Sequence, residues 1–427
     1  MNVTSFGILS DWRETKLMPE ASRNRLSASR VRQPYWRKTV KKLNVALVGT
    51  GFMGKAHSIA TAVVPILFGS PVEIERKVVV DIDDELARNA AAQYGFAEHA
   101  TDWREVVSRP DIDIVDICTP NDTHAAIAIA AAKAGKHVMC EKPMAMTVAD
   151  AEAMHAAAKE TGVVTMISYN YRHTPALQMA KRLIDEGRIG EILTFRGYYL
   201  QDWGADPSTP LSWRFNKEKA GSGTLGDIGT HVIDAARLLV GEFESVNSIV
   251  KTFIAERPLP AGRFFGPAGQ ASSEKGKVDV DDMAMTMIKF SNGVCGTIEV
   301  TRNAWGHHNQ LGFEIHGTRG SIAFDYQRLN ELRVAFADDP SDAFGFRTIY
   351  SGPHQPFGDK LWPVAGMGQG YIDIKSIEWY NFLQAIAGNQ PAAPNFEDGV
   401  QIERIADAIL ASGQSGVWEH VQQPARG

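Results

Sequence analysis

The feature that most constrains this chain is a short apolar run that opens into three spaced glycines. The run Leu43–Val48 leads into Gly49-Thr-Gly-Phe-Met-Gly54, and a helix-like segment follows from Lys55. In this order the first glycine permits a tight strand-to-helix turn, the second lets backbone approach a pyrophosphate, and the third allows close helix–strand packing. The phosphates would lie on N–H groups of the helix N-terminus. The residues expected to line this dinucleotide site are Gly49, Thr50, Gly51, Phe52, Met53 and Gly54.

A carboxylate after the next apolar run supports this interpretation. Lys77–Asp81 reads as a second buried strand, and Asp81 ends it where a ribose hydroxyl would be held. Asp81 lies 27 residues after Gly54, more than the usual ~20. Pro65, Gly69 and Pro71 each interrupt a helix and predict an insertion between the first helix and the second strand. The residues after Asp81 add two carboxylates and no arginine, so a 2'-phosphate would be repelled. We therefore expect NAD rather than NADP.

Length and composition indicate an ordinary globular protein. The 427 residues allow two to three domains at roughly 150 residues each. The chain is 44% hydrophobic and 22% charged, and no apolar run approaches the ~18 residues of a membrane span. Its three cysteines, Cys118, Cys140 and Cys295, show neither metal nor disulfide spacing, which favours a reducing cytoplasm.

The net charge of −6 conceals a basic N-terminal segment. Residues 1–42 carry +7 and the remainder −13. An acidic body argues against nucleic acid as a partner. The segment lacks the apolar core of a signal peptide and a twin-arginine pair, so export is not indicated. We expect residues 1–42 to be a disordered leader, or to follow from a start codon assigned too far upstream.

The next stretch, residues 43–170, alternates short apolar strands with helix-length segments. This rhythm is typical of a parallel sheet built from βαβ units, so we expect an NAD-binding Rossmann domain here, doubly wound. The expected strands are 43–48, 77–81, 112–118, 137–140 and 163–169, and the expected helices include 84–94, 124–134 and 148–161.

After Tyr171 the pattern changes to strands joined by tight turns. Asn292-Gly293 and Thr318-Arg-Gly320 separate adjacent runs, which indicates hairpins of an antiparallel sheet. We expect residues 171–427 to form an α+β domain for substrate binding and oligomerisation, with residues 255–280 as a long surface loop. The expected strands are 191–201, 246–254, 283–290, 294–301, 311–316 and 320–325, with helices at about 227–240 and twice after 373.

Polar residues follow two expected strands of the first domain. Ligands of an open α/β sheet bind outside the carboxyl ends of its strands, which favours Thr119, Pro120, Asn121 and His124 as residues near the nicotinamide; a plain turn with an Asn cap is the alternative. Glu141-Lys142-Pro143 follows the next strand. A lysine there can favour an alkoxide developing from a substrate hydroxyl, whereas a solvated Lys–Glu pair is the simpler interpretation.

A third motif lies in the second half, from Gly221 to Asp234. On a helix Asp227, His231 and Asp234 share one face. A carboxylate four residues from an imidazole can orient it and raise its basicity, which suits His231 to accept a proton. Helix capping by Asp227 is one alternative, and a metal site is another. Because the motif contains no further close ligand, we expect no metal.

Together these features resemble the Gfo/Idh/MocA family, the glucose-fructose oxidoreductase and inositol dehydrogenase group, over nearly the whole chain from Leu43. The most specific parts are Glu141-Lys142-Pro143 and the Asp227…His231 helix, with Trp213-Arg214 before it. Gly221-Ser-Gly223 departs from the commoner triple glycine. The stretches Gly51–Ser58 and Leu200–Trp203 are similar to levoglucosan and glucoside 3-dehydrogenase-like members.

The resemblance implies an NAD-dependent dehydrogenase that oxidises a secondary hydroxyl of a sugar, glycoside, anhydrosugar or cyclitol. Lys142, Asp227 and His231 fall on the catalytic positions, and Glu141, Lys142, Trp213 and Arg214 lie near the cofactor. A homodimer or homotetramer is implied, with no membrane or nucleic-acid partner. Residues considered for sugar contacts are Arg172, Gln201, Trp203, Arg302 and Asn303.

Two other functions remain open at this point. Some relatives cleave glycosides through transient oxidation by bound NAD, and a chromogenic glycoside assay separates that route from net oxidation. A sugar-sensing regulator on the same fold is the second. Such proteins can dispense with the Lys, Asp and His set that this chain retains.

Overall fold

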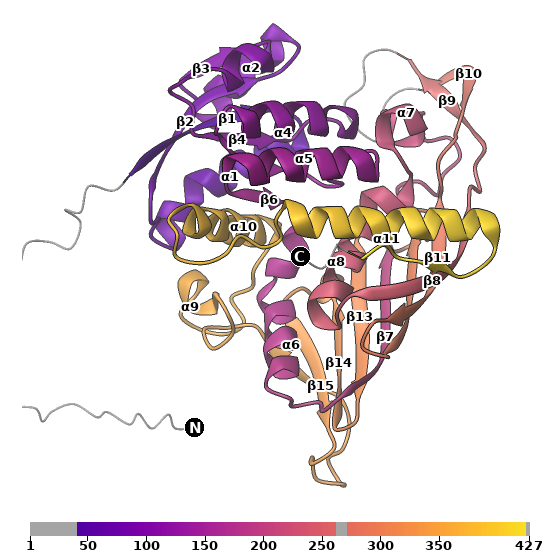
Figure 1. The fold of residues 1–427 in the computed structure, drawn as a ribbon. Coiled ribbons are helices and arrows are strands. Elements are labelled where there is room, and N and C mark those ends of the chain that lie inside the picture. Colours follow the sequence, from indigo (N-terminus) through magenta and orange to yellow (C-terminus); the bar gives the residue numbers. More distant parts are fainter. Residues whose placement is uncertain (1–40, 262–270, 424–427) are drawn as a thin grey trace, which may run out of the picture. The chain divides into compact units, whose positions relative to one another are not determined.

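Two large sheets organise the described part of the chain, residues 41–261 and 271–423 of this computed structural model (Figure 1). The expected leader, residues 1–42, lies outside the described residues except for Lys41 and Lys42. No helix among the described residues has both the length and the apolar character needed to cross a membrane.

The first sheet has six parallel strands in the order β3-β2-β1-β4-β5-β6. This is the strand order of a Rossmann fold, and it confirms the expected class. Its strands are β1 (Lys42–Val48), β2 (Glu73–Val80), β3 (Glu98–Ala100), β4 (Ile114–Ile117), β5 (His137–Cys140) and β6 (Thr165–Ile167). The short edge strand β3 was missed, because it has only three residues, none of them fully buried.

The helices predicted at 84–94, 124–134 and 148–161 are found within one residue of these bounds, whereas α3 was not predicted. Asp83 and Thr147 cap α2 and α5 by accepting backbone N–H bonds, and Gly95 and Gly162 end them with positive φ. The helices are α1 (Phe52–Leu67), α2 (Asp84–Tyr94), α3 (Trp103–Val107), η1 (Asn121–Thr123), α4 (His124–Lys133) and α5 (Val148–Thr161).

The expected interruption at Pro65 is wrong. Helix α1 continues through Pro65 to Leu67. A proline so close to the helix end removes one backbone hydrogen bond and leaves the earlier turns intact. The long spacing between Gly54 and Asp81 therefore comes from a long helix and a long second strand.

The second sheet has nine strands in the order β16-β15-β14-β13-β7-β12-β11-β8-β17. Every pairing is antiparallel except β7 with β12, at the centre. The hairpins predicted at Asn292-Gly293 and Thr318-Arg-Gly320 join β11 to β12 and β13 to β14. The strands are β7 (Ile192–Leu200), β8 (Phe243–Lys251), β11 (Met283–Phe290), β12 (Cys295–Thr301), β13 (Gln310–Gly317), β14 (Gly320–Asp325), β15 (Glu331–Phe336), β16 (Arg347–Tyr350) and β17 (Glu419–His420).

The predicted surface loop at 255–280 contains a separate two-stranded sheet. Strand β9 (Glu256–Pro260) pairs with β10 (Ala271–Lys277). The guanidinium of Arg257, fully buried, donates to the carbonyl oxygens of Gly204 and Asp206. Strand β9 is thereby fixed to the loop that follows β7, which composition alone did not reveal.

Helices cover one face of the second sheet and connect it to the first (Figure 1). Helix α11 packs on β8, α8 on β7, and α6 on β14 and β15, while α10 packs against α1 of the Rossmann half. The helical elements are η2 (Asn170–His173), α6 (Pro175–Asp185), η3 (Trp213–Phe215), α7 (Lys217–Ala220), η4 (Leu225–Gly229), α8 (Thr230–Leu239), η5 (Tyr326–Arg328), α9 (Gly358–Leu361), α10 (Tyr371–Ile386) and α11 (Phe396–Ser415).

Candidate active site

The loop from β1 to α1 fits a dinucleotide pyrophosphate. Gly49 has φ +101°, and a Cβ there would lie 2.6 Å from the carbonyl oxygen of Cys118. A Cβ on Gly54 would lie 2.1 Å from the Gly49 carbonyl oxygen, whereas one on Gly51 would meet nothing within 4 Å. The α1 N-terminus has no side-chain cap and no acidic residue in its first turn. Its N–H groups are therefore available to an anion.

Asp81 follows β2 beside this loop. Its Oδ2 accepts hydrogen bonds from the backbone N–H of Thr50, at 3.1 Å, and from the Thr50 hydroxyl. The exposed Phe52 and partly buried Met53 begin the helix. The carboxylate is thus fixed beside the first turn of α1, where a ribose hydroxyl would lie.

The segment after β4 is held mainly by its own contacts. Asn121 is buried and donates to the Ala220 carbonyl at 3.0 Å. His124 is fully buried, with Nδ1 2.9 Å from the Pro143 carbonyl oxygen and Nε2 2.9 Å from that of Thr119. The His124 bonds join the ends of β4 and β5. Pro120 lies in the same segment, between Thr119 and Asn121. In this structure His124 connects two strand ends, and a direct cofactor contact stays a prediction.

Lys142 follows Glu141 after the end of β5 and reaches the second half of the chain. Its Nζ donates to the carbonyl oxygen of Asp227 at 2.7 Å and to Oδ1 at 3.0 Å. The two side chains keep 17% and 26% of their exposure. Burial alone would raise the pKa of Asp227, but the ammonium of Lys142 and the guanidinium of Arg214 lower it to about 2. The structure thus brings together two of the three predicted catalytic residues as an ion pair.

A widened helical turn carries Asp227 and leads to His231. Residues Leu225–Gly229 form a π-helix, η4, which continues into α8. Single π-helical turns occur mostly at functional sites. The turn requires small residues, because a Cβ on Gly229 would lie 2.9 Å from Leu225 and one on Gly226 would lie 2.4 Å from the Ser222 hydroxyl.

His231 lies near Asp227 but is not oriented by it. Within the described residues neither ring nitrogen has a hydrogen bond, and Nδ1 is buried without a partner. Burial and the nearby Lys142 ammonium hold the pKa of His231 well below its usual range. The Asp227 carboxylate raises the pKa of His231, as expected, but burial and the Lys142 ammonium outweigh it. The imidazole is neutral at physiological pH, which still lets it accept a proton.

Tyrosines surround His231, and sequence analysis missed them. Ring centroids of Tyr171, Tyr169 and Tyr199 lie 4.6, 5.7 and 6.1 Å from that of His231. The Tyr171 and Tyr199 hydroxyls are 2.8 Å apart, and the Tyr199 hydroxyl donates to Oδ1 of Asn309 at 2.6 Å. Tyr171 comes from η2, Tyr199 from β7 and Asn309 from the segment before β13. No local spacing in the sequence could therefore have shown that these side chains meet.

The residues considered for sugar contacts divide into two groups. Gln201 donates to Asn309 at 2.8 Å and accepts from the Trp203 indole at 2.7 Å, which extends the same polar chain. Asn303 donates to the Gly204 carbonyl at 3.2 Å, while its Oδ1 is buried without a partner among the described residues.

Two arginines in that set are held by buried carboxylates. Arg172 pairs with Asp234, and Arg302 donates to Asp282 at 2.9 Å. Both guanidinium groups are almost fully buried. These pairs account for the two arginines as framework, and their contact with a sugar stays a prediction.

Trp213 and Arg214 form the short turn η3 near the same site. The Arg214 guanidinium lies 4.5 Å from the centre of the Trp213 ring, and its carbonyl oxygen accepts from Arg302 at 3.3 Å. Arg214 is exposed, and its charge contributes to the low pKa of Asp227. The pair is therefore placed beside the catalytic candidates.

A buried ionic cluster lies behind Lys142. His57, on α1, has Nδ1 2.8 Å from Asp116 and Nε2 3.0 Å from Glu141. The Lys375 ammonium, from α10, donates to Glu141 at 2.8 Å and to Glu378 at 2.9 Å. We name these five residues the buried ion network. All are at least 96% buried.

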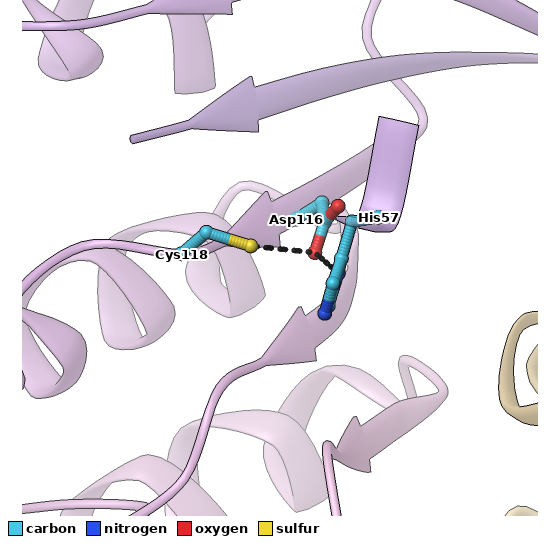
Figure 2. Close-up of side chains that lie close together, drawn as sticks. All are labelled: His57, Asp116 and Cys118. Atoms are coloured by element: carbon cyan, nitrogen blue, oxygen red, sulfur yellow. Dashed lines mark hydrogen bonds and ion pairs between the residues drawn. The ribbon is translucent and has the colours of Figure 1, made fainter. Parts of the chain in front are cut away.

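Part of this network also has the spacing of a metal site. His57, Asp116 and Cys118 offer ligand atoms within 4.8 Å of one another, and Figure 2 shows them converging. However, the ammonium of Lys375 lies 3.0 Å from Nε2 of His57. Burial alone would lower the pKa of His57, but the Asp116 carboxylate raises it well above its usual range. The positive charge that faces the carboxylates of Asp116 and Glu141 is thus supplied by His57 and Lys375 in this structure.

Comparison with known proteins agrees with this geometry. Residues 43–169 match the model of an oxidoreductase family with an NAD-binding Rossmann fold, and residues 177–323 match the GFO/IDH/MocA C-terminal domain. Levoglucosan dehydrogenase of Pseudarthrobacter phenanthrenivorans is 53% identical over 90% of this chain and 99% of its own length. Inositol 2-dehydrogenase of Rhizobium meliloti is 28% identical over 86% of this chain and 95% of its own.

A solved structure shows the same similarity in three dimensions. Levoglucosan dehydrogenase in complex with NADH and levoglucosan matches with a TM-score of 0.85 and 52% identity, covering 90% of this chain and all of that one. With both family models and a relative of this identity spanning most of its length, the chain belongs to the GFO/IDH/MocA family of NAD-binding oxidoreductases.

Proposed function

We propose that this chain oxidises a secondary hydroxyl of levoglucosan or a closely related anhydrosugar or pyranose, with NAD as oxidant. The observation that carries the proposal is the placement of Lys142 and Asp227 beside a neutral, tyrosine-lined His231. The relative named levoglucosan dehydrogenase directs the choice of sugar.

Each catalytic residue has a distinct part in this proposal. Lys142 donates a hydrogen bond to the substrate oxygen and favours its developing negative charge. His231, neutral and without a hydrogen-bond partner in the described residues, accepts the hydroxyl proton. Asp227 holds the ammonium of Lys142 in place. Bound NAD would supply the acceptor for the hydride from the carbon that carries this hydroxyl.

The polar chain beside His231 suits a sugar. Tyrosine rings offer apolar faces to the C–H side of a pyranose, and Asn309, Gln201 and Trp203 offer hydrogen-bonding groups to its hydroxyls. We propose Gln201, Trp203 and Asn303 as sugar contacts, with Asn309 added to them. Arg172 and Arg302 are better suited to supporting this wall than to contacting the sugar.

The division of labour between the two halves is also a proposal. Residues 43–170 would bind NAD, and residues 171–427 would bind the sugar and pair with another copy. An apolar patch supports the pairing: Ile249, Met285 and Met287 are about half exposed on the uncovered face of the second sheet, and Ile249 pairs with Met285 in register. Light scattering on Met285→Glu should show a smaller assembly than the parent protein, and an unchanged mass would count against this face.

All three cysteines are free, and we propose a reducing cytoplasm as the working compartment. Fractionation of cells that make the full-length chain would test it, and recovery of the protein outside the cytoplasm would reject it.

The function is tested by NADH formation across a panel of levoglucosan, pyranosides and inositols. We expect the highest kcat/KM with levoglucosan or another 1,6-bridged or pyranose ring, and a large loss of turnover in Lys142→Met. Cleavage of a chromogenic glycoside without net NADH would instead indicate the glycosidase route. Sugar binding with no turnover of any kind would indicate a sensor.

A further inference from the structure

Helix α10 brings a lysine from near the C-terminal end of the chain to the edge of the Rossmann sheet. The helix packs against α1, and its first residue, Tyr371, contacts Met53 of the dinucleotide loop through its hydroxyl at 3.5 Å. One turn later Lys375 is fully buried between Glu141 and Glu378. Burial alone would lower the pKa of Lys375, but these two carboxylates raise it, so the ammonium stays charged.

Glu141 divides its two carboxylate oxygens between different partners. Oε1 accepts from Lys375 at 2.8 Å and lies 3.0 Å from Nε2 of His57. Oε2 accepts from the backbone N–H of Lys142 at 3.2 Å. One oxygen is therefore held by the buried ion network, and the other holds the residue that bears the catalytic ammonium.

This arrangement gives Lys142 two anchors on opposite sides. Its backbone is fixed through Glu141, and its ammonium is fixed by Asp227 on the π-helical turn. The first anchor depends on a positive charge, since a buried carboxylate needs a partner to remain ionised. Lys375, which supplies this charge together with His57, lies more than 230 residues further along the chain.

We propose that Lys375 is a positioning residue for the oxidation: by anchoring Glu141, it holds Lys142 where its ammonium meets the substrate hydroxyl. The proposal rests on the proposed function, in which Lys142 contacts the reacting oxygen. A displacement of about 1 Å at such a group can cost about 100-fold in rate, so loss of the anchor has a measurable kinetic effect.

The rival explanation is that the buried ion network only stabilises the fold. Glu378, the other carboxylate that pairs with Lys375, distinguishes this structural role from a positioning role. Glu378 lies on α10 with Lys375, is equally buried, and has no bond to Lys142 among the described residues. A structural role predicts similar behaviour for Glu141 and Glu378. A positioning role predicts that substitution of Glu141 lowers kcat and that substitution of Glu378 does not.

Four variants of the full-length protein make the test: Glu141→Gln, Lys375→Met, Glu378→Gln and Lys136→Met. Lys136 is a matched control, because it is a buried lysine that donates to carbonyl oxygens of Arg109 and Ile112, at the opposite end of the sheet. For each variant, kcat with levoglucosan, NADH affinity by fluorescence and the melting temperature are measured.

We expect kcat to fall about 10- to 100-fold in Glu141→Gln and Lys375→Met, with NADH affinity within about threefold. Glu378→Gln and Lys136→Met should lose thermal stability yet keep kcat within about twofold. Equal kcat in Glu141→Gln and Glu378→Gln would overturn the proposal. If Lys375→Met does not fold, the paired substitution Lys375→Met with Glu378→Gln and the Glu141→Gln variant decide the outcome.

Lys142→Met keeps the two proposals apart. If Lys142→Met retains turnover, the proposed function of Lys142 fails first. If Lys142→Met is inactive while Glu141→Gln and Lys375→Met turn over normally, only the positioning role fails.

Discussion

The Rossmann sheet presents an edge to the candidate site, whereas the nine-stranded sheet presents a face. At the edge, residues act through their position directly after a strand: the glycine loop after β1, Asp81 after β2 and Lys142 after β5. At the face, Tyr199 points from within β7 beneath α8, which carries His231. Under the proposed function, this difference predicts that substitutions at the edge alter cofactor use and chemistry, while substitutions at the face alter sugar recognition.

The largest effect should come from the edge. Lys142→Met keeps the length of the side chain and removes the charge that stabilises the developing alkoxide. We expect kcat to fall about 10²- to 10⁴-fold, with NADH affinity within a few-fold, measured by steady-state kinetics and fluorescence titration. Near-normal turnover would remove Lys142 from the chemistry.

The next effect also belongs to the edge. In Asp81→Ser the carboxylate that would repel a 2'-phosphate is lost, so the preference for NAD over NADP should narrow about 100-fold. The measurement is kcat/KM for both cofactors with one sugar. Asp185→Ser, which removes an exposed acid on α6, is the control and should change the preference little. A preference unaltered in Asp81→Ser would show that ribose selection lies elsewhere.

A substitution on the face should act on the sugar instead. Asn309→Ala removes the acceptor that receives hydrogen bonds from Tyr199 and Gln201. Loss of one such group is worth about 1 to 1.5 kcal/mol, so the KM for the sugar should rise about tenfold with kcat nearly retained. The adjacent Gln310→Ala is the control, since Gln310 donates to Asp325. A fall in kcat at constant KM would contradict the contrast between edge and face.

The smallest effect concerns pH and His231, where the two sheets meet. The groups near this imidazole are Lys142, Glu141, Lys375, Asp227 and the three tyrosines. Because burial and Lys142 lower its pKa, His231 stays neutral as pH falls through 6.5 and is protonated only below that. Initial rates of oxidation should therefore change little between pH 8 and 6.5. An acid limb centred at or above pH 6.5 would exclude His231 as the proton acceptor.

The edge was predictable from sequence, for a local reason. Three glycines, Asp81 and Lys142 each follow a short apolar run, and the ends of parallel strands must meet at one side of the sheet. Strand and helix periodicity located most elements to within a few residues. The exceptions include β3, which is too short to show a pattern, and α1, which tolerates Pro65 where propensity predicts a break. The sequence also did not predict α6, β15 and β16 in the second half.

The face and the buried ion network were not predictable in the same way. Tyr171, Tyr199 and Asn309 lie far apart in sequence and meet only after β7 pairs with β13. Lys375 is one lysine in an otherwise ordinary helix, and its partners become visible only when α10 packs on α1. Likewise, the low pKa of His231 depends on burial, which one neighbouring carboxylate in the sequence could not reveal.

Deletion of Ile228 or Gly229, between Asp227 and α8, would turn this segment into an ordinary α-helix. The i→i+5 turn holds one residue more than an α-helical turn, so its loss would rotate everything before α8 by about 100° relative to that helix. Asp227 would then leave Lys142, while His231 would keep its place on α8. Loss of a single codon would thus give a chain with the same fold and dinucleotide loop but without the Lys142–Asp227 pair. Such a change is a short evolutionary step from an enzyme to a binding protein.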